Sequence, residues 1–223
     1  MAYAHPVTAT NSSGKRRAPG RPRSDDVVDT RRRVLREAQE QFGERGFAAV
    51  SMDGLASAVG VNVRSIYHYF PSKRALFDSA AAAAYETYGE EVMARVWVHT
   101  DLRSRLHGFV DVHRTMYREQ RYLTSFLSVV MTETIATNRP STNPFPDETA
   151  QAVEPIVALN RVLADEAIAH GELAEGVTRD AAVSLLHLVG MGIGLAALDE
   201  TSDLVAVLDA LDLLIDGTLL VDP

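Results

Sequence analysis

Beyond the first 24 residues, the apolar positions of the chain recur at the spacing of α-helices. In one short segment, Met52, Leu55, Ala56 and Val59 stand at i, i+3, i+4 and i+7, so one face of a helix carries all four side chains. The alternation of apolar and polar residues that is typical of strands is almost absent. The pattern therefore predicts an all-α protein with about nine helices.

Residues that start and stop helices divide this pattern into segments. Gly46 and Gly60 favour helix ends, and the side-chain oxygens of Asn62 and Ser72 can cap helix starts. The segment 138–146 contains three prolines and predicts a long interior loop. The predicted helices run from about 27 to 46, 52 to 59, 63 to 69, 73 to 97, 101 to 119, 121 to 137, 147 to 170, 179 to 199 and 203 to 219.

Charge is distributed unevenly along the chain. The 223 residues include 22 basic and 30 acidic side chains, a formal net charge of -8, which by itself argues against a nucleic-acid partner. Residues 1–80 nevertheless carry a net charge of +5, from 13 basic and eight acidic side chains, whereas residues 81–223 carry -13. This asymmetry indicates a nucleic acid or a membrane surface as the partner of the basic end.

Several classes of protein are disfavoured by what the sequence lacks. It contains no cysteine, which excludes disulfides and thiolate metal sites. The first 14 residues lack the apolar core of a secretory signal. The longest mostly apolar run, 185–198, is shorter than the ~20 residues that span a bilayer. We therefore expect a soluble cytoplasmic protein with no membrane partner.

No residue pattern typical of catalysis, cofactor binding or metal binding stands out. The glycines of the segment 190–194 resemble a nucleotide-binding loop, but they lie inside a predicted helix and no strand precedes them. His107 and His113 are six residues apart, which does not place both on one face of a helix as metal ligands. We expect no enzymatic activity, no cofactor and no metal; an enzyme in the acidic part of the chain is the alternative.

The segment 51–70 has the spacing of a helix-turn-helix. Ala56 is small enough for two helices to cross closely, and Gly60 suits the left-handed conformation that ends a helix. Ile66, six residues later, returns to the core, so the second helix projects at a fixed angle. On spacing alone, an ordinary helical hairpin is the alternative.

The residues from Ile66 to Phe77 favour the helix-turn-helix over an ordinary helical hairpin. Residues Ile66-Tyr-His-Tyr-Phe-Pro-Ser-Lys-Arg-Ala-Leu-Phe77 resemble the LYYHFxSKxxLF signature of the TetR family of transcriptional regulators. The segments 42–47, 51–56 and 60–61 match the same pattern, and 170–178 resembles the turn before the family's eighth helix.

The resemblance implies an N-terminal three-helix DNA-binding domain with a helix-turn-helix, followed by a larger helical domain for ligand binding and dimerisation. We accordingly divide the chain into a flexible basic arm over 1–24, a DNA-binding domain over 25–72 and the larger helical domain over 73–223.

The predicted DNA contacts lie on and around the second helix of the helix-turn-helix. Arg64 stands where many members of the family carry glycine, and an arginine there can make a bidentate contact to guanine. A phosphate contact or a solvated side chain is the alternative for Arg64. The predicted contact residues are Ser51, Asn62, Val63, Arg64, Ser65, Tyr67, His68, Tyr69 and Lys73.

Three of these residues are expected to contact phosphates. The resemblance implies this role for Tyr67, Tyr69 and Lys73, with packing against the first helix as the alternative for the tyrosines. Lys73 and Arg74 stand in the first turn of a helix, where the helix dipole disfavours cations, so a DNA phosphate is expected to compensate their charge. Two solvated surface cations are the alternative.

The basic arm carries a second candidate DNA contact. Gly20-Arg21-Pro22-Arg23 looks like the core of an AT-hook, in which proline keeps the strand extended while the flanking arginines enter the minor groove. Arg21 and Arg23 are the predicted contacts. The alternative is a basic tail that only speeds association with DNA.

The last two predicted helices carry the expected dimer interface. The segment 180–200 is apolar nearly all round, and Leu204, Leu208, Leu211 and Ile215 form a stripe on the final helix. By resemblance to the family, these helices pair with their copies in a homodimer; an intramolecular helical core is the alternative.

A ligand pocket is expected among residues 85–170, with a contribution from the eighth helix. Mixed aromatic, methionine and histidine side chains suit a mostly apolar site with a few polar groups. Ordinary core packing is the alternative for each residue. The candidates are Trp97, His107, His113, Met116, Tyr117, Phe126, Met131 and His187.

These features predict a DNA-binding transcriptional regulator. We expect a homodimeric repressor that binds a palindromic operator in double-stranded DNA and is released by a small-molecule effector. A sequence-tolerant architectural protein is the alternative among DNA-binding functions.

Overall fold

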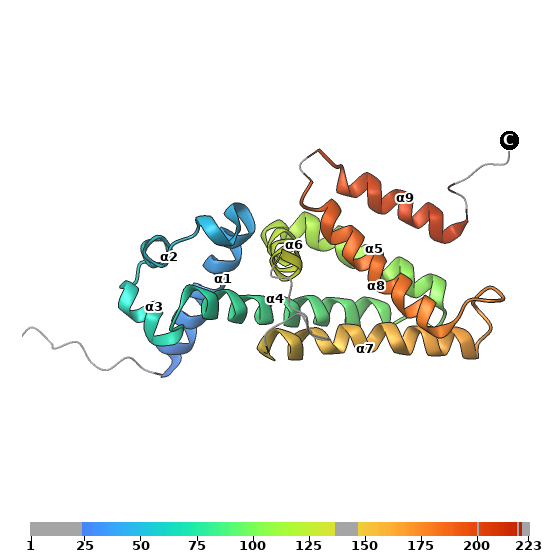
Figure 1. The fold of residues 1–223 in the computed structure, drawn as a ribbon, viewed down its shortest axis with the longest axis horizontal. Helices are drawn as coiled ribbons and strands as arrows, with labels where there is room; N and C mark the ends of the chain where they lie inside the picture. Colours follow the sequence, from blue (N-terminus) through green and yellow to red (C-terminus); the bar gives the residue numbers. More distant parts are fainter. Residues whose placement is uncertain (1–23, 137–146, 200, 218, 220–223) are drawn as a thin grey trace, which may run out of the picture.

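Nine α-helices make up the secondary structure of this computed structural model, which describes residues 24–136, 147–199, 201–217 and 219 (Figure 1). No strand occurs within those ranges, so the all-α prediction is confirmed. The helices are α1 (Ser24–Ala49), α2 (Met52–Val59), α3 (Val63–Tyr69), α4 (Lys73–Val96), α5 (Leu102–Glu119), α6 (Arg121–Ala136), α7 (Asp147–Ala169), α8 (Arg179–Ala196) and α9 (Leu204–Asp216).

The predicted helix boundaries agree with the structure to within three residues, but the end of α1 differs in kind from the prediction. Gly46 has the backbone angles φ 74° and ψ 167°, which are not helical, and helical hydrogen bonding resumes as far as Ala49. The predicted stop at Gly46 is therefore a kink inside α1. Glycine tolerates this positive φ because it has no Cβ.

The long helix α4 connects the two ends of the molecule. The short helices α2 and α3 lie with α1 at the N-terminal end of α4, and α7 runs alongside its C-terminal half (Figure 1). α5 and α6 also pack on α4, and α8 and α9 form the outer layer near the C-terminus. The position of α1–α3 relative to the other helices therefore depends on how α1 packs on α4 and on α6.

An aromatic cluster joins α1, α4 and α6. The rings of Phe42 and Phe77 meet edge-on with centroids 5.1 Å apart, and Phe77 meets Phe126 in the same way at 5.4 Å. All three side chains are fully buried. One continuous core extends from Val34 in α1 to Leu163 in α7, so apolar packing crosses the boundary predicted between residues 72 and 73.

Ion pairs and a small apolar cluster hold α9 against α5. The two ring nitrogens of His107 lie 2.7 and 3.0 Å from carboxylate oxygens of Asp212 and Asp216. The Arg114 guanidinium lies 2.9 Å from Asp209 and 2.7 Å from Asp212. Hydrogen bonding to Asp212 raises the pKa of His107, although partial burial opposes the shift. Beside these charges, a separate apolar cluster consists of Val110, Ile193, Leu204 and Leu208.

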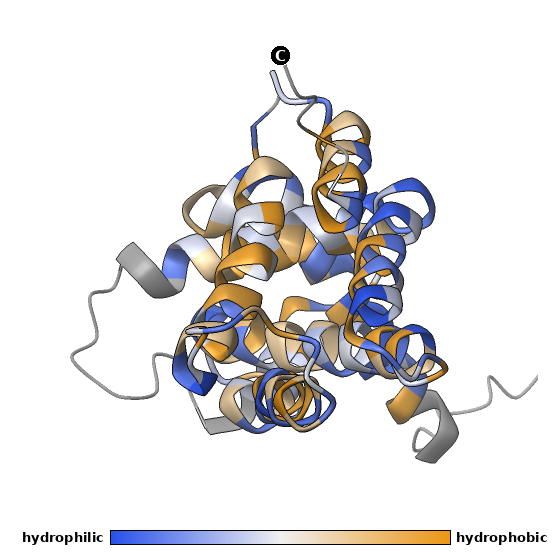
Figure 2. Ribbon diagram, turned by 90° about the vertical axis from the view of Figure 1, so that its right-hand side faces the viewer, coloured by the Kyte–Doolittle hydropathy of each residue, from blue (hydrophilic) through white to orange (hydrophobic). Residues whose placement is uncertain are grey.

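The outer faces of α8 and α9 leave large apolar side chains in solvent. Leu185 and Leu188 on α8 are 61% and 62% exposed, and Leu214 on α9 is 57% exposed. Figure 2 shows hydrophobic stretches in the helices near the C-terminus. By length and composition, α8 could also span a membrane, which the length of the mostly apolar run 185–198 did not indicate. One such helix is weak evidence for a membrane protein.

Candidate nucleic-acid interface

Helices α2 and α3 form a helix-turn-helix whose ends are fixed by local hydrogen bonds. The Ser51 hydroxyl accepts a hydrogen bond from the Gly54 amide at 3.1 Å and caps α2, while the Asn62 side chain accepts one from the Arg64 amide at 2.8 Å and caps α3. Gly60 ends α2 in the left-handed conformation, with φ 74°. The turn predicted between the two helices is therefore confirmed.

A buried anchor sets the orientation of α3. Ile66 on the inner side of α3 and Phe70 directly after the helix are buried, and they share one core with Leu55 and Ala56 of α2. The Arg33 guanidinium of α1 donates a hydrogen bond to the carbonyl of Val59 at 2.7 Å. A cation at the C-terminal end of a helix interacts favourably with the helix dipole.

The outer side of α3 presents polar side chains to solvent. Arg64, Ser65, Tyr67 and His68 are exposed, and Tyr67 is 49% exposed. Since Arg64, Ser65 and His68 stand at i, i+1 and i+4, they share one side of this short helix. A helix with a buried inner side and a polar outer side can enter the major groove of DNA.

The other predicted contact residues have structural roles as well. Ser51 and Asn62 are exposed but cap helices, and Val63 and Tyr69 are half-buried against the core. The ring of Tyr69 meets that of His68 edge-on, with centroids 5.5 Å apart. Arg21 and Arg23 lie outside the described residues.

The cations at the start of α4 are compensated within the chain, which corrects the argument that a DNA phosphate is required there. The Lys73 ammonium donates a hydrogen bond to the carbonyl of Ala48 at 3.1 Å and lies 4.6 Å from the centroid of the Phe47 ring. Arg74 forms an ion pair with Asp78, one turn further along α4, at 2.9 Å. A phosphate contact by Lys73 stays a prediction.

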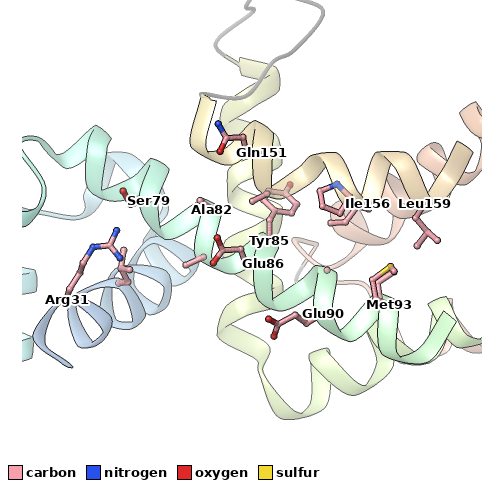
Figure 3. Close-up of a pocket in the computed structure, with 16 residues that line it drawn as sticks. Arg31, Ser79, Ala82, Tyr85, Glu86, Glu90, Met93, Gln151, Ile156 and Leu159 are labelled. Carbon is pink, nitrogen blue, oxygen red and sulfur yellow. The ribbon is translucent and has the colours of Figure 1, made fainter. Parts of the chain in front are cut away.

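A cavity of about 640 Å³ lies along α4, between α1 and α7 (Figure 3). Its lining includes Arg31 from α1, Tyr85, Glu86 and Glu90 from α4, and Ile156 from α7. Burial raises the pKa of Tyr85 to about 12, so the phenol is neutral at physiological pH. The volume is within the range of small-molecule sites.

None of the eight predicted ligand-binding residues lines this cavity, so their role in ligand binding stays a prediction. Met116 and Phe126 are buried in the main core. His113 is held in the interior: one ring nitrogen lies 2.9 Å from the carbonyl of Phe109, and the other lies 3.1 Å from the Tyr88 hydroxyl. Burial lowers the pKa of His113 to about 4, so its ring is neutral at physiological pH.

The remaining five candidates lie nearer the periphery. His107 is engaged with α9 through its two ion pairs, and the Trp97 indole donates to the sulfur of Met93 at 2.9 Å. Met131 reaches α8, where a Cβ added at Gly194 would meet its side chain. Tyr117 packs on the small apolar cluster beside α9, and His187 is exposed on α8.

The sequence contained one indication of the cavity that the prediction did not use. Glu86 and Glu90 stand one turn apart on an alanine-rich helix, and the positions three and four residues away from either carry no basic side chain. Two like charges at this spacing destabilise a helix slightly. Arg31, Tyr85 and Ile156 gave no such indication, because they meet only when α1, α4 and α7 pack together.

The sequence of the helix-turn-helix is similar to those of bacterial transcriptional regulators. Residues 34–80 match the family model described as bacterial regulatory proteins, tetR family. Over 106 residues, the chain is 31% identical to the HTH-type transcriptional activator FasR of Mycolicibacterium smegmatis. This match covers 47% of this chain and 48% of FasR. The chain thus spans about half the length of this curated relative.

Solved structures share the fold over most of the chain. A transcriptional regulator from Saccharomonospora viridis in complex with choline has a TM-score of 0.69 at 21% identity, over 85% of this chain and 96% of that one. FadR from Bacillus subtilis in complex with stearoyl-CoA has a TM-score of 0.66 at 17% identity, over 83% and 98%. At these identities, the likeness concerns the fold.

Proposed function

Since this chain belongs to the TetR family of transcriptional regulators, we propose that it is a homodimeric repressor that binds a palindromic operator and is released by a small-molecule ligand. The observation that carries the proposal is the helix-turn-helix, in which α3 is anchored by Ile66 and turns Arg64, Ser65 and His68 to solvent. We propose no enzymatic reaction, no cofactor and a cytoplasmic location.

We assign base readout to the exposed side of α3 and backbone contacts to the residues around it. Arg64 would contact guanine, while Tyr67, Tyr69 and Lys73 would contact phosphates. In the N-terminal arm, Arg21 and Arg23 would follow the minor groove. The net charge of +5 over residues 1–80 supports this assignment, because the local charge near the phosphates governs association with DNA.

We assign the homodimer interface to α8 and α9. Support comes from the exposed leucines at positions 185, 188 and 214, which would lose their contact with water in a dimer. A two-fold symmetric dimer presents two copies of α3, so it reads a palindrome. Their centres must lie ~34–36 Å apart to meet successive major grooves on one side of DNA.

We assign the ligand response to the helices that follow the helix-turn-helix, from α4 onward. Two structures of similar fold hold choline and stearoyl-CoA, which supports a ligand of some kind for this chain. A ligand that binds better to the conformation with wrongly spaced α3 helices would shift the population away from DNA. Repression follows if a dimer on a promoter excludes other proteins from the same DNA.

Selection of bound sites from random double-stranded DNA by the full chain tests the proposal. We expect a palindrome whose half-sites are centred about one helical turn apart. Transcription from a promoter that contains this palindrome should fall when the protein is added. The relative FasR is named an activator, so activation is the alternative outcome. A rise in transcription would refute the repressor assignment. Uniform coating of DNA, with no selected site, would favour an architectural protein.

The interface is tested by the double substitution Leu185→Glu and Leu188→Glu. We expect a monomer by sedimentation and at least a tenfold loss of affinity for the palindrome. Ile168→Glu is the matched control, because Ile168 is an exposed apolar residue on α7, outside the proposed interface. A variant that stays dimeric would refute the assignment to α8.

A further inference from the structure

The cavity between α1, α4 and α7 contains acidic groups at its rim and apolar groups along its walls. Leu35 of α1, Val92 of α4 and Leu159 of α7 are buried side chains that line it, and Ile156 is half-buried there. Glu86 and Glu90 of α4 are exposed on the same side of their helix (Figure 3). The site therefore combines an apolar surface with two carboxylates.

The side-chain carboxylates of Glu86 and Glu90 form no hydrogen bond or ion pair with any residue in the described ranges. The neighbouring Glu91 differs, because it forms an ion pair with Arg95 at 3.2 Å. Glu86 and Glu90 are one helical turn apart, so their charges repel each other across a short distance. A cation between the two carboxylates would remove this repulsion.

The other polar groups of the cavity favour the same ligand. The ring of Tyr85, between the side chains of Gln151 and Glu86 in Figure 3, is a neutral aromatic surface, and the face of such a ring attracts cations. Arg31 of α1 is the basic residue of the lining; its guanidinium lies over the ring of Phe70, which directly follows α3, 5.4 Å from the ring centroid. The lining thus carries two negative charges and one positive charge.

We propose that this cavity binds an amphipathic organic monocation. Its ammonium group would lie beside Glu86, Glu90 and the Tyr85 ring, with its hydrocarbon part against Ile156 and Leu159. The proposal rests on the ligand response proposed above and gives it a site and a chemical class. Because α1, α4 and α7 all line the cavity, an occupant contacts both the DNA-reading end and the helix that packs on the rest of α4.

The test is isothermal titration of the full chain with three compounds that share a hexyl chain: hexyltrimethylammonium, neutral N-hexylacetamide and anionic hexanesulfonate. We expect the cation to bind at least tenfold more tightly than the amide, and the sulfonate to bind most weakly. Equal affinity for the three compounds, or no binding of the cation, would overturn the proposal.

Variants locate the site. The double substitution Glu86→Gln and Glu90→Gln should weaken binding of the cation at least tenfold while leaving the amide unchanged, and Ala152→Phe should weaken both by filling the cavity. Glu119→Gln, at an exposed position of α5 outside the cavity, is the matched control. Circular dichroism checks that each variant is folded. Unchanged affinity of the double variant for the cation would overturn the site.

DNA binding, measured on the same samples, separates this inference from the proposed function. Cation binding without any selected DNA site would support the cavity and refute the repressor. An intact DNA site without cation binding would refute the cavity and leave the repressor standing. Release of DNA by the cation, but not by the sulfonate, would support both.

Discussion

The Arg33 guanidinium of α1 donates a hydrogen bond to the main-chain carbonyl of Val59, the last residue of α2, at 2.7 Å. Carbonyls in the last turn of a helix have no partner within the helix. This bond therefore satisfies one of them and fixes α2 to α1. Since α3 follows α2 after a short turn, the same bond helps to position the exposed side of α3.

Replacement of Arg33 should weaken the attachment of α2 and α3 to α1. We expect Arg33→Ala to lower the free energy of unfolding by about 1 kcal/mol, the usual net contribution of a hydrogen bond, because solvent around the exposed Arg33 screens its charge. DNA affinity should fall as well, because α3 loses its fixed orientation. Arg32→Ala is the control in urea unfolding, since Arg32 is exposed and no described residue pairs with it. Equal loss of stability in both variants would contradict this role of the bond.

Arg64→Ala should relax the preference for one base pair in each half-site. A bidentate contact to guanine contributes ~1–3 kcal/mol of discrimination, so the affinities for matched and mismatched operators should converge. The comparison uses binding to operators that differ only at that position. Arg45→Ala, at an exposed position near the end of α1, is the control and should retain the preference. Uniform weakening on all operators would identify Arg64 as a phosphate contact.

Gly43→Ala should destabilise the junction of α1 and α6. A Cβ at Gly43 would lie 2.9 Å from the carbonyl oxygen of Tyr122 and 3.0 Å from the amide nitrogen of Phe126, so main chain would have to move. We expect a loss of ~1–3 kcal/mol in urea unfolding, as is usual when a packed interior is overfilled. Gly89→Ala is the control: its Cβ would lie 4.0 Å from Ile156, and alanine should stabilise the interior of α4. Equal stability of the two variants would contradict the close approach.

His107 should make the protein less stable as the pH rises above neutrality. Its pKa is raised in the folded state by Asp212, so its contribution is fully present below the unfolded pKa of ~6.5 and is lost as the pH rises through the folded pKa. In His107→Gln this decrease should disappear, whereas His68→Gln, at an exposed position of α3, should retain it. The measurement is the free energy of unfolding from pH 5 to pH 9. A decrease of equal size in His107→Gln would show that another group causes it.

His113 should have the opposite effect, at acid pH. Its pKa is lowered to about 4 by burial. Between this value and the unfolded pKa of ~6.5, the unfolded chain therefore binds a proton at His113 and the folded chain does not. Stability is therefore lost as the pH falls from ~6.5 to ~4, by on the order of 3 kcal/mol at ~1.4 kcal/mol per pKa unit. His113→Gln should reduce this loss, measured by urea unfolding between pH 4 and pH 7. The same acid limb in both proteins would contradict the assignment to His113.

The exposed side of α3 could be predicted from the sequence, whereas the residues that line the cavity were missed. Arg64 and His68 stand on a short helix whose caps and stop are encoded within a few positions, so their shared side follows from the spacing alone. Glu86 and Tyr85 form a site only beside Ile156, about seventy positions away in the sequence. The predicted ligand residues do not line this cavity, because the types that suit a pocket, such as Phe126, also suit a core.

The sequence by itself determined the helices and the helix-turn-helix, because their signals act within one or two turns of chain. The side chains of Asn62 and Ser72 cap helices as predicted, each through an amide two or three residues away. Tertiary structure decided what these helices surround. Lys73 meets Ala48 across 25 positions, and His107 meets Asp212 across 105. Contacts at such separations depend on how α4 packs against its neighbours, which periodicity and capping residues do not encode.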